Sequence, residues 1–338
     1  MVIDERISTR FYVVYFIAAC VVVSIHCSLE MPRSGSYQLW YVRYATKWAV
    51  PFFFLMSGVF AKAGYENTFQ GFCAFGKKKI YSLVLPYVLW CVIGAALRMP
   101  FIIDYLISNS VYNDVNEILG FTSGYPLGNG VLWFLRTLII LQLFLMVALG
   151  CVSRDKKLRF LCWSIFLALA AYLVIAHVDS KWLARLIVCP SAPIYFIGGY
   201  VMSNLFLRRQ HLLFSELIFV GGCVVLVVIT MAGGGESILL RHVSNVAIVS
   251  SLVGLIDILI DKQVISMCFC WKTSFFVYCF HRVPVEYAGK FMGGIDALNM
   301  DIVYLLFVVG SVLFALGIAH VLHRYLPVVY IALNGARK

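Results

Sequence analysis

A histidine closes the first apolar run of this chain. Residues 16–30 read FIAACVVVSIHCSLE, so His26 ends a stretch that is apolar enough to cross a membrane. Imidazole titrates near neutral pH and can take the proton of an attacking hydroxyl. A core histidine bonded to a backbone carbonyl is the alternative. The position of His26 therefore raises the hypothesis of general-base catalysis at one face of a membrane.

Further basic side chains lie inside apolar stretches. Arg43 and Lys47 are four residues apart, so they share a helix face, where like charges repel unless an anion lies between them. Arg136 lies within LWFLRTLIILQLF, beyond the start of its apolar stretch. A charge at the centre of a membrane helix costs about 2.5 to 3.5 kcal/mol on insertion scales, so each is a functional hypothesis. Snorkelling to outer headgroups is an equal alternative for Arg43 and Lys47.

A second polar cluster comes late in the chain. His281, Arg282, Glu286 and Lys290 follow one another within one apolar stretch. The last three are spaced by four residues, so Glu286 can pair with either base on one helix face. Inside the apolar stretches basic residues outnumber acidic ones, which are Asp257 and Glu286. This imbalance leaves room for an anionic ligand.

These side chains must be positioned by helices that cross a membrane. The 338 residues are 62% hydrophobic and 13% charged, with a mean hydropathy of +0.91, which excludes a soluble single-core protein. The apolar runs are long enough to span a hydrocarbon core of about 30 Å as helices and lack the alternation of a β-barrel. We expect an all-α, polytopic helical bundle of about ten transmembrane helices. The expected spans are 10–28, 41–62, 80–97, 131–150, 159–177, 183–206, 214–232, 243–260, 273–292 and 302–324.

The distribution of Lys and Arg orients this bundle. If the N-terminus is cytoplasmic, most of the 27 basic residues fall in the inner connecting segments. The outer segments then hold Arg33, Arg98, Lys181, Arg185 and Arg241. Because positive residues favour the cytoplasmic side, we expect both termini in the cytoplasm. The net charge of +11 is thus a topology signal, and its scattered residues do not indicate nucleic-acid binding.

The spans and their short connections use nearly every residue. We therefore expect one membrane-embedded domain over residues 1–338 with no appended soluble domain. No internal repeat is apparent, which lowers the odds of a secondary transporter. The 11 cysteines lack metal-binding spacing, so we expect neither a metal nor a disulfide. Pro51, Pro86 and Pro284 lie inside expected spans and are predicted to kink them.

Four groups of residues occur in order along the chain. They are YFIAACVVVSIH (15–26), WAVPFFFLMSGVF (48–60), KKKIYSLVLPYVLW (77–90) with LWFLRTLIILQL (132–143), and SFFVYCFH (274–281). Each piece alone is weak because it is apolar, but the ordered set resembles the acyltransferase 3 family of bacterial membrane acyltransferases. The resemblance covers most of the chain.

The resemblance implies a helical bundle in the bacterial inner membrane that takes an acyl group, often acetyl, from cytosolic acetyl-CoA or another acyl-CoA. The acyl group passes to a hydroxyl of an envelope saccharide or lipid-linked sugar. Acyl-CoA is then the donor co-substrate, the lipid bilayer and the acceptor are the other partners, and no metal or nucleic acid is expected. The acceptor, the acyl length and the oligomeric state stay open.

Residues carry over to the family by position. His26 corresponds to the histidine that closes the first helix, and His281 to a histidine of the ninth. The remaining matches are Lys77, Lys78 and Lys79 for a basic cluster before the third helix, and Trp133 with Arg136 for the WFL stretch.

One position departs from the family pattern. Many members carry an arginine, or sometimes a lysine, eleven residues before the first histidine, where this chain has Tyr15. Eleven helical residues return to nearly the same face and rise about 16 Å, so residues 15 and 26 lie on one stripe that could guide the CoA arm. Tyrosine donates one hydrogen bond but has no fixed charge. Either another basic residue takes the place of the missing arginine, or the activity is altered. Arg10 cannot simply do so, because it lies on a nearly opposite face of the helix.

The expected site assigns a role to each group. His26 is the general base, or the residue that becomes acylated. Arg136 is the first candidate donor to the oxyanion, followed by Arg43 and Lys47. Tyr15, Lys77, Lys78, Lys79 and Trp133 are expected to bind acyl-CoA, and His281, Glu286 and Lys290 the acceptor.

Two other function classes remain at this point. The excess of basic residues also suits a transporter or flippase of an anionic envelope glycolipid. Tyr15 also suits a catalytically degenerate family member that acts within a polysaccharide assembly complex.

Overall fold

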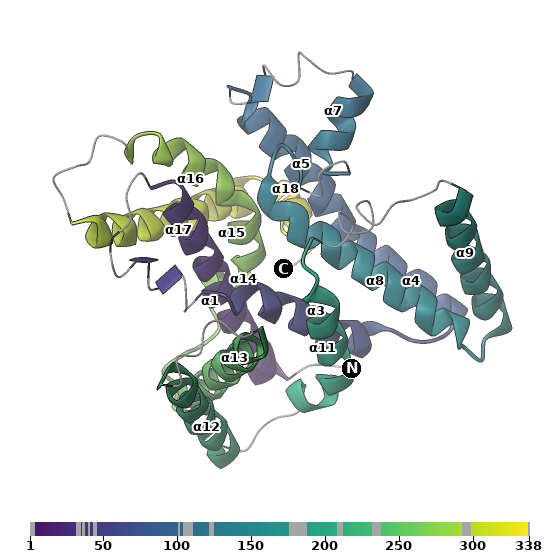
Figure 1. Cartoon of the computed structure of the whole chain (residues 1–338), viewed down its shortest axis with the longest axis horizontal. Helices are drawn as coiled ribbons and strands as arrows, with labels where there is room; N and C mark the ends of the chain where they lie inside the picture. The colour runs from purple at the N-terminus through teal and green to yellow at the C-terminus, as the bar shows by residue number, and fades with distance from the viewer. Residues whose placement is uncertain are drawn as a thin grey trace. The chain divides into compact units, whose positions relative to one another are not determined.

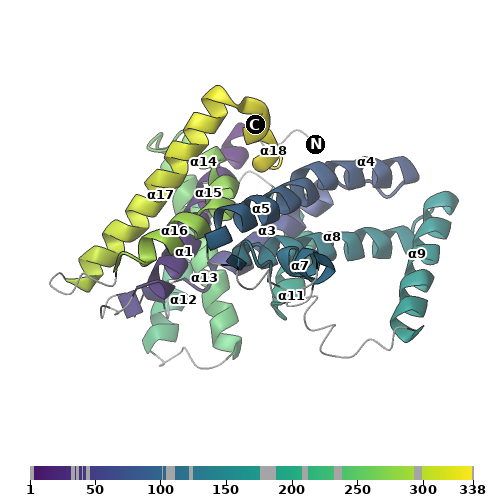
Figure 2. The same cartoon turned by 90° about the horizontal axis from the view of Figure 1, so that it is seen from above.

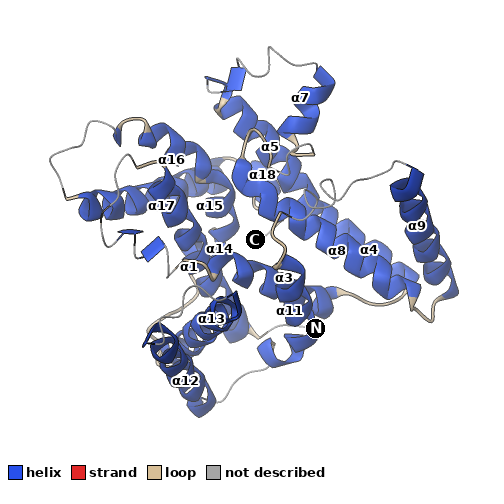
Figure 3. Cartoon of the chain, in the orientation of Figure 1, coloured by secondary structure: helices blue, strands red, loops and turns tan. Residues whose placement is uncertain are grey.

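The structure of the chain is a computed structural model. It describes residues 4–31, 35, 38–39, 41–42, 46–100, 102–103, 111–121, 125–175, 188–207, 212–231, 238–292 and 299–336. Across these ranges the regular elements are helices, and no strand occurs (Figure 3). The all-α prediction is therefore confirmed for the described part of the chain. Arg43 lies outside it, as does the first part of the expected span 183–206.

Five helical runs in the described ranges are long and apolar enough to cross a membrane. They are Glu5–Leu29, Phe69–Leu97, Gly130–Cys151, Leu240–Asp261 and Met300–Tyr325, and Ala49–Gly64 and Phe214–Val228 are shorter apolar helices. The expected number of ten spans and the cytoplasmic location of the termini stay predictions.

The helix bounds follow. The longer helices are α1 (Glu5–Leu29), α3 (Ala49–Gly64), α4 (Phe69–Lys79), α5 (Leu85–Leu97), α8 (Trp133–Cys151), α9 (Lys156–Ile175), α11 (Ala192–Phe206), α12 (Leu212–Met231), α13 (Ile238–Asp261) and α17 (Met300–Tyr325). The shorter ones are η2 (Ile80–Val84), α7 (Val111–Ile118), η3 (Gly130–Leu132), α14 (Phe269–Lys272), α15 (Ser274–Phe280), α16 (Arg282–Gly289) and α18 (Pro327–Leu333).

The residues group into two compact units. The first contains residues 1–53 and 204–326, and the second contains residues 54–203 and 327–338. The expectation of a single domain stays a prediction.

In the first unit, α1 packs against α13, α14, α15, α16 and α17. Residues 6 and 10 of α1 pair with residues 261 and 257 of α13, so these two helices are antiparallel. Phe16 lies 5.3 Å from Trp271 and His26 lies 5.1 Å from His281, both as ring centroid distances. From the first contact to the second, both segments advance by ten residues in the same direction, so α1 is parallel to the α14–α16 segment. The helix α17 lies beside α15 (Figures 1 and 2).

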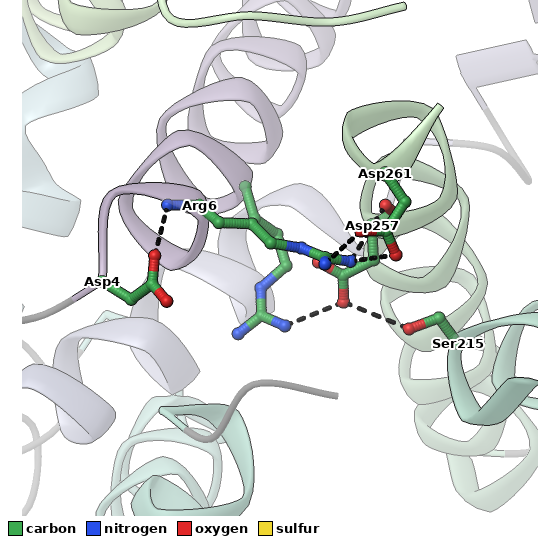
Figure 4. A network of polar contacts seen from close by, with 6 residues as sticks. Asp4, Arg6, Ser215, Asp257 and Asp261 are labelled. Atoms are coloured by element: carbon green, nitrogen blue, oxygen red, sulfur yellow. Dashed lines mark hydrogen bonds and ion pairs between the residues drawn. The ribbon is translucent and has the colours of Figure 1, made fainter. Parts of the chain in front are cut away.

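A charged ladder joins α1 to α13 in this unit (Figure 4). Arg10 is 2% exposed, and it donates to Asp257 at 2.9 Å and to the carbonyl of Phe206. Arg6 pairs with Asp261, and Ser215 of α12 donates to Asp257 at 3.4 Å. A buried charge requires such a partner, because its desolvation is costly. The ladder therefore holds the start of α1 against α13.

Small residues let α12 and α13 pack closely as a hairpin. A Cβ added at Gly254 would lie 2.6 Å from the carbonyl oxygen of Ser215, and one at Gly222 would lie 2.8 Å from that of Ala247. Such contacts leave no room for a methyl group. Close backbone approach through glycine is typical of helices that pack within a membrane.

In the second unit, α8 and α9 form a hairpin and α4 packs against both. Trp90 of α5 donates its indole N–H to the carbonyl of Leu333 at 3.0 Å, which attaches α18 to α5. Gly58 of α3 meets the backbone of Phe196, and Gly199 of α11 meets the backbone of Leu55, so α3 and α11 also approach closely.

Candidate active site

His26 lies in the last turn of an uninterrupted helix. The N-cap residue Asp4 accepts a hydrogen bond from the backbone N–H of Arg6 at 2.9 Å, and α1 then continues for 25 residues to Leu29. Tyr15 and His26 therefore belong to one continuous helix, and eleven residues bring them to nearly the same face. The predicted stripe along α1 is thus present.

His281 lies where a second helix is interrupted. Pro284 has no backbone N–H, so the carbonyl of Phe280 lacks its usual partner four residues later. The helices α15 and α16 meet at this point, with His281 between them. The side chain of His281 is 0% exposed. Its Nδ1 lies 2.7 Å from the carbonyl oxygen of Tyr278 and 3.3 Å from that of Val277.

The two imidazoles lie side by side. Their ring centroids are 5.1 Å apart and the rings are tilted by 47°. Nδ1 of His26 and Nε2 of His281 are both buried, and neither has a hydrogen-bond partner among the described residues. Buried polar atoms are nearly always paired, so two unpaired atoms on adjacent rings point to a functional arrangement.

An ion pair lies next to these rings. Arg282 donates to Glu30 at 2.7 Å, and the two side chains are 20% and 25% exposed. A Cβ added at Gly289 would lie 2.7 Å from Cβ of Glu30, so only glycine allows α16 to come this close. Glu30 was not among the residues singled out from the sequence. The sequence feature that could have indicated Glu30 is its spacing, because Glu30 follows His26 by about one helical turn.

Aromatic rings connect Tyr15 to this pair. Tyr15 stacks on Phe53 at 5.6 Å and meets the edge of Phe52 at 5.3 Å. Phe53 lies 5.8 Å from Tyr278, which lies 6.1 Å from His281. The tyrosine that replaces the family's basic residue thus belongs to a continuous row of rings that ends at the histidines.

The other expected residues of the first unit lie at different depths. Glu286 is half-buried on α16, and Lys290, which caps that helix, is exposed. Lys47 is exposed just before α3. Arg43, the partner expected for Lys47, lies outside the described residues.

Arg136 and Trp133 lie in the second unit, in the first turn of α8. Arg136 is 6% exposed and interacts electrostatically with the Tyr87 side chain. Trp133 packs against Tyr125 and Phe54 with centroid distances of 6.4 and 6.5 Å. Arg136 is therefore buried rather than extended toward headgroups, as its position in the apolar stretch suggested.

The three lysines differ from the expectation that they precede a helix. Thr68 caps α4 by accepting from the N–H of Gly71 at 3.0 Å, and helix continues from Phe69 through the lysines to Leu97. Lys77 and Lys78 are exposed, whereas Nζ of Lys79 lies 4.7 Å from the ring centroid of Phe75. The first two offer free positive charge to phosphates, and the third has part of its charge covered by a ring.

No three metal-ligating side chains gather within the ranges that the structure describes.

Comparison with known protein families gives a match over most of the chain. Residues 14–324 match the model of acyltransferase 3, described as an acyltransferase domain, so the match extends over nearly the whole chain. No curated protein and no solved structure matches.

Proposed function

Because the chain belongs to the acyltransferase 3 family and is a membrane acyltransferase, we propose that it is an O-acyltransferase of the cell envelope. The donor in this proposal is a cytosolic acyl-CoA, acetyl-CoA in the first instance. The acceptor is a hydroxyl of an envelope saccharide or of a lipid-linked sugar. The protein acts in the bacterial inner membrane.

The pair of imidazoles is the observation that supports this reaction. A hydroxyl is a poor nucleophile until a base takes its proton, and neutral imidazole suits that task near pH 7. His26 is half-buried, so it can meet an acceptor, whereas His281 is fully buried. We therefore assign the base to His26.

The reaction is balanced in the following way. The acceptor oxygen attacks the thioester carbonyl, and its proton moves to the imidazole of His26. The carbon–sulfur bond then breaks, and the CoA thiolate leaves with the proton returned by the imidazolium. An ester of the acceptor and free CoA are the products. The negative oxygen of the intermediate needs fixed donors in a dry site, and buried Arg136 is the first candidate for this role.

The remaining expected residues are assigned to the donor and the acceptor. Lys77 and Lys78 present ammonium groups that can bind CoA phosphates without a glycine-rich loop, and Lys79, Trp133 and Tyr15 are also assigned to the donor. Glu286 and Lys290, on or next to the short helix that begins at Arg282, are assigned to the acceptor. Arg43 and Lys47 stay the next candidate donors to the oxyanion. Carboxylates and ammonium groups suit a sugar because both form hydrogen bonds with hydroxyls.

Envelope glycans provide the direct test. Mass spectrometry would compare surface saccharides and lipid-linked sugars from cells with the wild-type gene, without the gene, and with His26→Gln. We expect an acyl mass increment in the wild type that is lost in both other strains. His320→Phe is the matched control, because His320 is an exposed histidine of α17. Unchanged acylation in the strain without the gene would contradict the proposed function, whereas substrate flux without a mass increment would favour a transporter.

A further inference from the structure

The two unpaired nitrogen atoms of the histidine pair are complementary in one protonation pattern. Nδ1 of His281 lies 2.7 Å from the carbonyl oxygen of Tyr278. A carbonyl oxygen can only accept, so Nδ1 of His281 must carry the hydrogen. In a neutral ring the hydrogen is then absent from Nε2, which is left as an acceptor. That acceptor is buried and has no partner among the described residues.

The neighbouring groups leave few ways to satisfy Nδ1 of His26, which is also buried and without a described partner. The guanidinium of Arg282 can only donate, and the carboxylate of Glu30 already accepts from it at 2.7 Å. Nε2 of His281 is the acceptor on the adjacent ring.

We propose that His281 is a positioning residue, which accepts a hydrogen bond from Nδ1–H of His26 and so holds Nε2 of His26 as the basic atom. This inference rests on the proposed function and adds a residue to it. The same logic orients the base in other acyl-transfer sites, where a third group accepts from the imidazole on the side away from the nucleophile.

The geometry of the rings suits this bond. A hydrogen bond of about 2.9 Å, extended by one ring radius at each end, gives a centroid separation close to the 5.1 Å observed. The bond is not formed in this structure, since neither nitrogen atom has a hydrogen-bond partner among the described residues. Rotation of the His26 ring about its outer side-chain bond is soft, so alignment costs little. Catalytic hydrogen bonds often tighten only when substrate binds.

The pairing also explains why His281 is at a helix interruption. The ring is fully buried and bonded to the backbone of its own helix, so it has little freedom to turn. A fixed acceptor is what a positioning residue requires. A group that contacts the acceptor sugar would instead need exposed surface, which His281 does not have in this structure.

The protonation pattern is the first test, and it does not depend on activity. Solid-state NMR of the full chain, labelled with ¹⁵N-histidine in lipid, reports which nitrogen carries hydrogen. Neutral histidine ordinarily carries it on Nε2. We expect His26, identified by the signal missing in His26→Gln, to carry it on Nδ1 and to revert to Nε2 in His281→Phe. A His26 signal with hydrogen on Nε2 in the wild type, or no change in His281→Phe, would overturn the proposal.

Kinetics with conservative variants give the second test. A glutamine at position 281 can donate to the Tyr278 carbonyl and accept from His26, whereas phenylalanine can do neither. We expect His281→Phe to lower kcat for acetyl transfer about 10²-fold with little change in KM for acetyl-CoA, and His281→Gln to recover most of the loss. Equal losses in both variants would overturn the positioning role. The expected NMR pattern without any acyl transfer by the wild type would instead count against the proposed function alone.

Discussion

At the residue scale, the account depends on how buried polar atoms are satisfied. His26 and His281 come from segments about 250 residues apart, yet their rings lie 5.1 Å apart with the Glu30–Arg282 ion pair beside them. Two neutral imidazole rings can be buried at this position, because burying a charge costs far more free energy than burying a neutral imidazole. The ion pair is also partly exposed, so its charges keep some hydration.

Tyr15 gives the first prediction at this scale. Tyr15→Phe keeps the ring contacts with Phe52 and Phe53 and is expected to change stability by less than about 0.5 kcal/mol. Tyr15→Ala removes them and is expected to cost about 2 kcal/mol, because the ring is half-buried. Thermal unfolding in detergent measures both.

The variant Tyr15→Arg tests whether Tyr15 contributes to acyl transfer or is only the loss of a basic residue. We expect it to lower acyl transfer, because the guanidinium cannot replace the ring in the row that leads through Phe53 and Tyr278 to His281. An increase in activity would show instead that the tyrosine is a loss from the family's pattern.

Helical periodicity explains which residues of the site could be predicted. The common face of Tyr15 and His26 follows from 3.6 residues per turn within one helix. The partners Glu30 and Arg282 could not be found in the same way, because their contact joins distant segments. Arg10 shows the same limit: its charge predicted cytoplasmic topology, but it lies 2% exposed against Asp257.

At the element scale, prolines act according to their position in a helix. Pro284 interrupts the helix next to His281, and Pro86 follows the π-helix η2, in which the N–H of Leu85 bonds to the carbonyl of Ile80. A missing N–H inside a helix leaves a carbonyl free and distorts the preceding turn. Pro51 is the third residue of α3, in a first turn whose N–H groups lack helical partners anyway. The kink predicted for the span around Pro51 stays a prediction, because residues 43–45 just before α3 lie outside the described part of the chain.

The variant Pro284→Ala tests whether the interruption between α15 and α16 is needed to position His281. The restored N–H can bond to the carbonyl of Phe280 and join α15 to α16, so we expect equal or greater thermal stability with acyl transfer lowered at least about tenfold through displacement of His281. Pro51→Ala is the control, with activity expected to stay within about twofold. Full activity in Pro284→Ala would show that the interruption does not position the histidine.

A second prediction at this scale concerns Asp155, which precedes α9. Its carboxylate accepts from the backbone N–H groups of Phe69 at 2.8 Å, Leu158 at 3.2 Å and Lys157 at 3.0 Å. These bonds, first that from Phe69, hold the pKa of Asp155 below its ordinary value. The folded state therefore binds fewer protons than the unfolded state. The stabilisation is present above about pH 4 and is lost as pH falls through the lowered pKa.

Thermal unfolding from about pH 7 to about pH 3 measures this effect. We expect Asp155→Asn to melt below the wild type near pH 7, with the difference closing in the acidic range. Glu66→Gln, which changes an exposed carboxylate in the connection between α3 and α4, is the control. A gap between Asp155→Asn and wild type that stays constant with pH would contradict the assignment.

Span boundaries show what apolar patterns predict well. The expected 10–28 and 302–324 agree with α1 and α17 within a few residues, because each is one apolar run with caps at its ends. The expected span 80–97 begins well after the start of its helical run, which is Phe69–Leu97. Residues 69–79, which end in three lysines, are helical because Thr68 caps α4 and because α4 packs against α8 and α9. An average of hydropathy along the sequence detects neither the cap nor these contacts.

At the scale of the whole molecule, the assigned roles are divided between the two units. The histidine pair belongs to the first unit, and Arg136 and the lysines of α4 belong to the second. The proposed reaction needs both sets, since the base must meet the acceptor while the phosphates of the donor need positive charge.

Neutralising the exposed lysines tests the donor assignment. We expect the double variant Lys77→Gln, Lys78→Gln to raise KM for acetyl-CoA about tenfold with kcat nearly unchanged, because phosphate contacts supply binding to the ground and transition states alike. The wild-type KM should also rise with salt, since exposed charges are screened. Lys262→Gln, exposed after α13, is the control. An unchanged KM in the double variant would place the phosphates elsewhere.

The central claim is that His26 takes the proton of the acceptor hydroxyl during acyl transfer. The most direct measurement is single-turnover transfer of labelled acetyl from acetyl-CoA to an envelope saccharide fraction by the purified protein in lipid, comparing wild type, His26→Gln and His320→Phe. The account predicts transfer by wild type and His320→Phe, and a rate at least about 10²-fold lower in His26→Gln with acetyl-CoA binding intact. Transfer by His26→Gln at the wild-type rate would contradict it.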